Sequence, residues 1–263
     1  MRSARKLGTL GRVADALREA VSRDAESSVV TAEISRLRAK PTSRIEPNDL
    51  LVLSYFSMLG YKVDFAHPAV VSAMGSSNQN WKAAGYFGAS VMMTCPSAAT
   101  RVEAVLRSDL ASTEVAFVLA SLQYLSMVPN TAVAFWAEVS SIANPSSNFP
   151  PHVRKRAYAC MLVCVRDDPS LLPPSQWAPR LAHCFTAEHD VGALLAVCSL
   201  LNGAIQASSK GWEGVIPPVI NVLLLFSESR VAKSATYRGV LCPWLHAKLL
   251  RLLRLFPRNL SRR

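Results

Sequence analysis

The feature that most constrains the fold of this 263-residue chain is an apolar pattern that repeats along it. Three helix-like segments align at a step of about 38 residues, through the triplets Val115, Leu119, Leu122; Val153, Ala157, Cys160; and Val191, Leu195, Cys198. One further step towards the N-terminus reaches Ser77, Trp81 and Ala84. Each unit has room for two helices and shows no strand pattern. Chance agreement between helices of similar length is the alternative explanation.

A period near forty residues with two helices per unit is typical of HEAT and armadillo repeats. The sequence therefore predicts an all-α fold, a right-handed α-solenoid of HEAT/armadillo-like helical repeats. The composition agrees, because hydrophobic residues make up 50% of the chain and aromatic residues only 8%. Its apolar content lies mainly in Ala, Leu and Val, as in packed helices. We expect an extended surface that binds partners rather than a central pocket.

Proline, glycine and capping residues predict where the helices begin and end. Residues 13–40 read as one or two polar helices, broken near 22–28. Asn48 is the expected N-cap of an apolar helix over Leu50–Leu59, which Gly60 ends. We expect two parts, a basic helical arm over residues 1–41 and a solenoid trunk over residues 42–263.

The stretch Cys242–Phe256 predicts an amphipathic helix. Its apolar face consists of Leu245, Leu249, Leu252 and Leu253, and a basic line beside it consists of Lys248, Arg251 and Arg254. Such a helix suits the seam of a helical stack, an anionic membrane surface or the groove of a partner. The repeat favours the seam, with the basic line solvated or facing another subunit.

The formal net charge of +11 favours phosphate-rich or acidic partners. No apolar run is long enough to span a bilayer, so we expect a soluble or peripheral protein. Residues 1–23 are rich in arginine, which leaves a mitochondrial presequence as an alternative, whereas a secretory signal is not predicted. The six cysteines lack paired spacing and sit in apolar patterns, so we expect reduced, buried thiols.

The sequence carries no recognisable catalytic or metal-binding pattern. A glycine-rich phosphate loop and a serine-hydrolase context are both missing. His183, Cys184 and His189 supply too few ligands for a metal ion. No enzyme activity, cofactor or metal is therefore expected. Nucleic-acid binding is disfavoured, because the basic residues do not follow the repeat.

Five segments, in this order, resemble the N-terminal trunk of the large adaptins of clathrin adaptor complexes. They are LGYKVDFAH (59–67), SSNQNWKAAGYFGAS (76–90), SDLAS (108–112), DPSLLPPSQW (168–177) and PWLHAKLLRLLR (243–254). Alpha-adaptin of the plasma-membrane complex is the nearest likeness and gamma-adaptin the next. A generic helical-repeat scaffold and an RNA-binding repeat protein are the rival interpretations.

The resemblance implies a non-enzymatic scaffold for vesicle-mediated protein transport and endocytosis. The implied partners are a sigma-type small subunit, a beta-type large subunit, a mu-type medium subunit, sorting-signal cargo peptides and a phosphoinositide membrane. The implied location is the cytoplasmic face of membranes, at plasma-membrane coated pits. The chain is shorter than a complete adaptin, so we expect a fragment or an abbreviated product with an exposed last repeat and poor stability.

The resemblance also implies two candidate binding sites. Arg18, in the pair Leu17–Arg18, matches an adaptin arginine that binds dileucine sorting signals. The lysine tract that binds phosphoinositide in alpha-adaptins is replaced here by Glu46, Pro47, Asn48 and Asp49. A strong headgroup site is therefore not expected. A weaker membrane contact is expected from Arg2, Arg5, Lys6 and Arg12.

Overall fold

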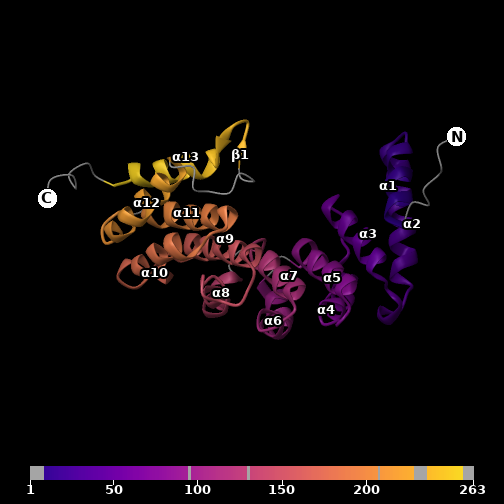
Figure 1. The fold of residues 1–263 in the computed structure, drawn as a ribbon. Coiled ribbons are helices and arrows are strands. Elements are labelled where there is room, and N and C mark those ends of the chain that lie inside the picture. Colours follow the sequence, from indigo (N-terminus) through magenta and orange to yellow (C-terminus); the bar gives the residue numbers. More distant parts are fainter. Residues whose placement is uncertain (1–8, 94–95, 129–130, 207, 228–235, 257–263) are drawn as a thin grey trace. The chain divides into compact units, whose positions relative to one another are not determined.

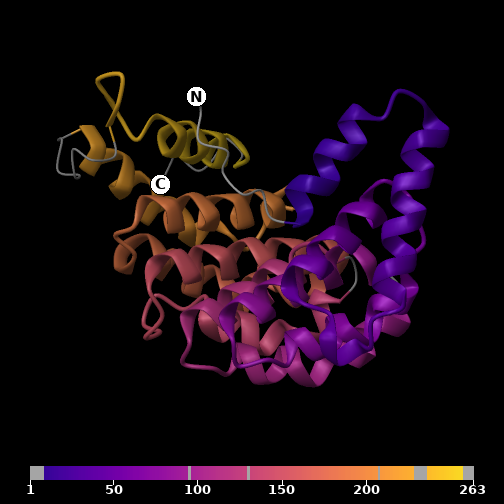
Figure 2. The same cartoon turned by 90° about the vertical axis from the view of Figure 1, so that its right-hand side faces the viewer.

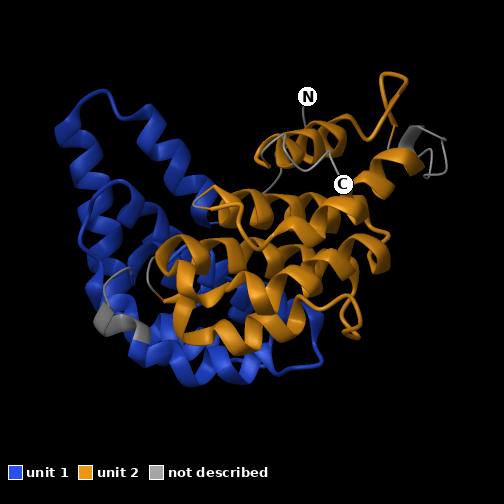
Figure 3. Ribbon diagram, turned by 90° about the vertical axis from the view of Figure 1, so that its left-hand side faces the viewer, with its two compact units in different colours: residues 1–128 blue, residues 129–263 orange. Residues whose placement is uncertain are grey.

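The computed structural model describes residues 9–93, 96–128, 131–206, 208–227 and 236–256, with 96–99 and 226–227 described by their backbone alone. Within these residues the fold consists of helices α1 to α13, short 3-10 turns and one small hairpin (Figure 1). The all-α helical-repeat fold expected from the sequence is confirmed. The chain divides into two compact units, Met1–Val128 and Pro129–Arg263 (Figure 3). The expected boundary near residue 41 stays a prediction.

The first unit contains seven α-helices and two 3-10 turns among its described residues. They are α1 (Thr9–Glu19), α2 (Arg23–Arg38), η1 (Thr42–Arg44), α3 (Pro47–Met58), η2 (Asp64–Ala66), α4 (His67–Met74), α5 (Gln79–Met92), α6 (Pro96–Leu110) and α7 (Val115–Leu125). Helix α5 packs against α3, α4 and α7, and α1 packs against α3.

The helix ends in this unit follow local chemistry, with two corrections to the sequence prediction. The first two helices are interrupted only at residues 20–22, as Figure 2 shows in indigo, because the Ser22 hydroxyl accepts from the Ala25 N–H at 3.1 Å and starts α2. The predicted break over 22–28 was therefore too long. The predicted Asn48 cap was wrong, since α3 begins at Pro47 and Glu46 is its N-cap.

The predicted stop at Gly60 is confirmed. Gly60 has a φ of +93°, which favours glycine. Its N–H donates to the Ser57 carbonyl at 2.9 Å, and the Tyr61 N–H donates to the Phe56 carbonyl at 3.0 Å. This pair of bonds is the Schellman arrangement that satisfies the last carbonyls of a helix.

The second unit contains six α-helices and a hairpin among its described residues. Its elements are η3 (Ala132–Phe135), α8 (Trp136–Ile142), α9 (Pro151–Asp167), η4 (Pro169–Leu171), α10 (Pro174–Ala187), α11 (Val191–Ile205), η5 (Glu213–Val215), α12 (Ile216–Ser227), β1 (Thr236–Tyr237), β2 (Val240–Leu241) and α13 (Pro243–Arg254). Helices α9, α11 and α13 pack in order, and α10 packs against α12.

The hairpin was not predicted from the sequence. Strands β1 and β2 pair antiparallel, with Thr236 opposite Leu241 and Tyr237 opposite Val240. Gly239, with a φ of +80°, and Arg238, with a φ of +49°, form the turn. Two residues per strand are too few for the alternation by which strands are recognised in a sequence.

The predicted seam position of α13 is confirmed. Leu245, Leu249 and Leu252 are fully buried, and α13 packs on α11 and α12. The Lys248 ammonium donates to the Ser199 hydroxyl on α11, so this member of the basic line is already used. Arg251 and Arg254 are exposed.

Two further expectations concern the thiols and the membrane. Five of the six cysteines are free and buried, namely Cys160, Cys164, Cys184, Cys198 and Cys242. Cys95 lies outside the described residues. Within the part of the chain that the structure describes, no helix is long and apolar enough to cross a membrane.

Candidate functional site

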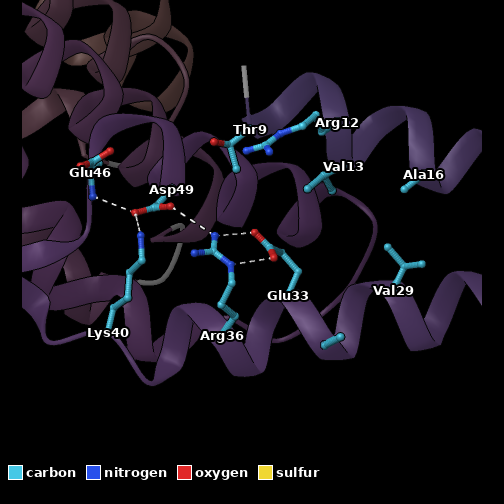
Figure 4. Close-up of a pocket in the computed structure, with 11 residues that line it drawn as sticks. Thr9, Arg12, Val13, Ala16, Val29, Glu33, Arg36, Lys40, Glu46 and Asp49 are labelled. Atoms are coloured by element: carbon cyan, nitrogen blue, oxygen red, sulfur yellow. Dashed lines mark hydrogen bonds and ion pairs between the residues drawn. The ribbon is translucent and has the colours of Figure 1, made fainter. Parts of the chain in front are cut away.

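The candidate site is a groove between the first two helices. It contains Arg12, one of the basic residues expected from the sequence to contact a membrane. This groove, called here the α1–α2 groove, has a volume of about 750 Å³. It is shown in Figure 4. Its lining comes from α1, α2 and the start of α3, through Thr9, Arg12, Val13, Ala16, Val29, Ala32, Glu33, Arg36, Lys40, Glu46 and Asp49.

The groove is held in place by a core beneath it. Val13 on α1 packs in one cluster with Val30 and Leu37 on α2 and with Val52 and Phe56 on α3. These side chains are nearly or completely buried. Burial of this apolar face positions a helix pair whose other residues are mostly polar.

Asp49 is the centre of the polar network in the groove. Its side chain is 6% exposed and accepts from the Lys40 ammonium at 2.7 Å. The same carboxylate accepts from the Glu46 N–H at 3.0 Å, which caps the start of α3. Arg36 lies 3.6 Å from its other oxygen. The negative charge of Asp49 is thus matched by Arg36 on α2, by Lys40 just after α2 and by the N-terminus of α3.

Arg36 also forms an ion pair with Glu33 within the groove. Its Nε and Nη2 donate to the two oxygens of Glu33 at 2.8 and 2.6 Å. These hydrogen bonds are the main reason that the pKa of Arg36 lies above its ordinary value, against the opposing effect of burial. The two cations nearest to Asp49 are therefore neutralised locally.

The structure describes one of the four basic residues predicted to contact a membrane. Arg12 lies on α1, is exposed and lines the groove. No ion pair joins it to the rest of the described chain. Arg2, Arg5 and Lys6 lie outside the described residues.

Arg18 does not line the groove. It occupies the last turn of α1, where its side chain is 79% exposed and its Nη1 lies 3.0 Å from an Asp15 carboxylate oxygen. An exposed pair of this kind contributes little to stability, so the guanidinium is free to exchange Asp15 for another carboxylate.

The sequence prediction missed the structural role of Asp49. The stretch Glu46–Asp49 was interpreted only as two acids in place of a lysine tract. The structure shows that Asp49 is buried and neutralised, whereas Glu46 lines both the groove and a neighbouring hollow with Arg44 and Trp81. The available signal was the capping-box spacing of two acids three residues apart. Its pairing with Lys40 depends on tertiary contact and had no local signal.

The chemistry of this site is that of binding. It presents Arg12, which has no acidic partner among the described residues, next to the ion pairs of Asp49 with Arg36 and Lys40. Among the described residues, no group of three or more His, Cys, Asp or Glu side chains is arranged to hold a metal ion. The fold and this groove together define a helical-repeat protein with a polar groove at its first helices, in which three cations and three carboxylates lie together.

The chain belongs to the adaptin family. Residues 26–263 match the model of the adaptin N terminal region. This match covers most of both units and confirms the resemblance found in the sequence.

The chain is similar to part of several longer proteins. It is 30% identical over 255 residues to the AP-2 complex subunit alpha-2 of Dictyostelium discoideum, which covers 92% of this chain and 25% of that protein. It is 29% identical over 211 residues to the AP-2 complex subunit alpha-1 of Arabidopsis thaliana, covering 77% of this chain and 20% of that protein. The AP-1 complex subunit gamma-like 2 of Homo sapiens is 25% identical over 92% of this chain and 31% of its own length. The chain therefore spans between a fifth and a third of these relatives.

Proposed function

We propose that this chain is a trunk segment of a clathrin adaptor large subunit that acts in vesicle-mediated transport and endocytosis without enzymatic activity. The observation that carries the proposal is the family match over residues 26–263. Two relatives that are subunits of AP-2 complexes support it further. A helical-repeat fold suits such a role, because stacked helices offer long surfaces to several partners at once.

The partners that fit this role are a sigma-type small subunit, a beta-type large subunit and a mu-type medium subunit. The corresponding location is the cytoplasmic face of the plasma membrane, at clathrin-coated pits. A gamma-type large subunit is the alternative, supported by the AP-1 gamma relative that covers 92% of this chain.

Co-expression with a sigma-type small subunit tests the proposal. The chain, carrying an affinity tag, is expected to retain the small subunit through purification and gel filtration. The small subunits of AP-2 and AP-1, offered together, distinguish the alpha-type from the gamma-type assignment by which one is retained. Retention of neither, with capture of an unrelated assembly or of RNA in a salt-sensitive manner, would overturn the proposal.

Arg18 is proposed to bind the acidic part of a dileucine sorting signal. Its exposed guanidinium and weak local pair with Asp15 support this role, since arginine can take a carboxylate with two parallel hydrogen bonds. In the complex with a sigma-type subunit, Arg18→Gln is expected to weaken binding of an acidic dileucine peptide by about tenfold. Arg23→Gln, at an exposed position at the start of α2, is the matched control. Equal effects of both variants would remove Arg18 from the site.

A weak membrane contact is proposed for Arg2, Arg5, Lys6 and Arg12. Arg12 supports it, because it is exposed and forms no ion pair within the described part of the chain, while the replacement of the lysine tract by Glu46 and Asp49 argues against a strong headgroup site. Sedimentation with liposomes that contain or lack phosphoinositide tests the contact. Binding that is the same for both kinds of liposome, and the same again for uncharged ones, would remove it.

A further inference from the structure

The second unit contains a pocket that the proposed adaptor role does not use. It lies between α8 and α10 and has a volume of about 520 Å³, within the usual range for ligand sites. This α8–α10 pocket is lined by Ser140, Ser141, Ala143, Asn144, Pro145, Ser146, Tyr158, Met161, Trp177, Arg180, Leu181, His183 and Cys184. All of these residues belong to the second unit, whereas the α1–α2 groove belongs to the first.

Arg180 is held in a fixed orientation in this pocket. Its Cζ lies 5.0 Å from the centre of the Trp177 ring, in the geometry of a cation–π contact. Trp177 is itself buried and is held edge-on by Trp136, with ring centres 5.4 Å apart. A guanidinium that stacks on a ring keeps its N–H edge available, so less entropy is lost when it binds a carboxylate.

The charge of the pocket lining is positive. The lining contains an arginine and a histidine and no carboxylate. Arg180 is exposed and forms no ion pair with the described part of the chain. Burial raises the pKa of Cys184 to about 11, so this thiol is uncharged at neutral pH. Burial also raises the pKa of Tyr158, whose hydroxyl lies 3.4 Å from the Cys184 sulfur.

The opposite wall offers hydrogen-bond acceptors. The Ser140 and Ser141 hydroxyls donate back into α8, to the Ala137 carbonyl at 3.1 Å and to the Glu138 carbonyl at 2.8 Å. Their hydrogens are thereby used, which leaves the oxygen lone pairs as acceptors. A free phosphate ion could pair with Arg180, but it offers few hydrogen-bond donors to the Ser140 and Ser141 oxygens. A polypeptide brings both carboxylates and backbone N–H groups.

We propose that the α8–α10 pocket binds an acidic segment of a partner polypeptide. Arg180 takes a carboxylate of that segment, and the segment's backbone N–H groups face Ser140 and Ser141. The inference concerns a second binding site and does not depend on the cargo role of Arg18.

Fluorescence anisotropy with the full chain tests this site. The probe is a fluorescein-labelled hexapeptide of sequence SELELS, and SQLQLS is the uncharged control. SELELS is expected to bind at least about tenfold more tightly than SQLQLS, because a charged hydrogen bond is lost with the carboxylates. Arg180→Gln is expected to weaken SELELS binding to the same extent, and Arg180→Lys, which keeps the charge but not the planar fork, by less.

The matched control is Arg156→Gln, which removes the same charge from an exposed position on α9 outside the pocket. It is expected to change binding by less than about twofold. Thermal melts of all variants show whether loss of the contact between Arg180 and Trp177 has unfolded the pocket. If Arg180→Gln is unfolded, peptide binding by Arg180→Lys is compared with that of the unchanged protein instead. No binding of SELELS, equal binding of both peptides, or equal effects of Arg180→Gln and Arg156→Gln would each overturn the proposal. Binding of phosphatidylserine vesicles through Arg180 without binding of SELELS would also overturn it.

Discussion

At the scale of single residues, Glu188 is a buried carboxylate of the second unit with several hydrogen-bond donors around it. Its oxygens accept from the Arg154 Nε at 2.7 Å and from Nη2 at 2.9 Å. One of them also accepts from the N–H groups of His189 and Asp190, both at 3.1 Å. Glu188 is 2% exposed in its side chain, so the ion pair joins α9 to the turn between α10 and α11 away from water.

This carboxylate makes stability depend on pH. Burial raises the pKa of Glu188, but the hydrogen bonds from Arg154 and from the two backbone N–H groups outweigh burial, and the net pKa lies below its ordinary value. A carboxyl whose pKa is lower in the folded state stabilises the fold above its unfolded pKa of about 4.3, and this stability is lost as the pH falls through the folded value.

We therefore predict that the free energy of unfolding decreases on acidification below about pH 4.3 and that part of the decrease belongs to Glu188. Glu188→Gln is expected to cost about 3 kcal/mol at neutral pH, since Arg154 is left without its counter-charge. On acidification, the free energy of unfolding of the Glu188→Gln variant should then decrease less than that of the unchanged protein. Urea unfolding at a series of pH values measures both slopes, and parallel slopes would contradict the assignment.

Lys82 supports the first unit in a similar way. Its ammonium is nearly buried and donates to the two Asp109 oxygens at 2.8 and 2.7 Å and to the Met74 carbonyl at 2.6 Å. It also lies 4.6 Å from the centre of the Phe117 ring. The Tyr86 hydroxyl donates to Asp109 at 2.7 Å. One side chain thus connects α4, α5, α6 and α7.

Lys82→Met is predicted to destabilise the fold by about 3 kcal/mol, because the Asp109 charge is then buried without a cation. Asp109→Asn leaves Lys82 buried and is expected to cost a similar amount. In a double-mutant cycle followed by urea unfolding, the combined loss should be smaller than the sum of the single losses by more than about 1 kcal/mol. Additive losses would mean that the two groups do not stabilise each other.

At the scale of elements, the contact between α4 and α5 requires a glycine. A Cβ atom on Gly85 would lie 2.5 Å from the Met74 nitrogen and 2.8 Å from the Ala73 carbonyl carbon, both of them backbone atoms of α4. At Gly75 an added Cβ would meet only carbonyl oxygens at 3.6 and 3.7 Å, which is ordinary contact. Gly75 is exposed at the C-terminal end of α4, whereas Gly85 is buried within α5.

Gly85→Ala is predicted to destabilise the fold by about 1–3 kcal/mol, because α5 must move away from α4. This loss would exceed the gain of up to about 1 kcal/mol that alanine brings to a helix interior. Gly75→Ala is expected to be neutral or slightly stabilising. Denaturant unfolding of both variants measures the difference, and a stabilised Gly85→Ala protein would show that the helices separate without cost.

The sequence predicted elements best where local chemistry decides them. The stop of α3 at Gly60, for example, follows from that residue's φ alone. The cap of α3 was misplaced because Asn48 is the preferred type of N-cap residue, whereas Pro47 suits the first helical position and the Glu46 N–H donates to Asp49. The groove was not predicted, because three helices form it and the neutralisation of Asp49 depends on Lys40, nine residues away in sequence. The membrane contact of Arg12 stays a prediction.

At the scale of the whole molecule, the repeat and the charge were visible in the sequence. Helices α7, α9 and α11 each contain one of the aligned triplets. The fourth triplet begins at Ser77, just before α5, and its other two residues lie within α5. The pairing of α9 with α11 and of α11 with α13 is what a repeated unit requires. The positive charge has no comparable order, because several cations are matched locally, among them Arg36, Lys82 and Arg154.

Membrane binding should therefore depend on the cations that remain unmatched, and we predict that it is weak and sensitive to salt. Binding to phosphatidylserine vesicles is expected at about 0.05 M salt and should be largely lost at about 0.5 M, because the Debye length shortens. Replacing Arg2, Arg5, Lys6 and Arg12 together by Gln should weaken binding more than replacing the exposed set Arg23, Lys155, Arg156 and Arg251. Both variants lose four positive charges, so a larger effect of the first set would identify a contact local to the N-terminus. Equal effects in vesicle sedimentation would mean that only the net charge of +11 attracts the membrane.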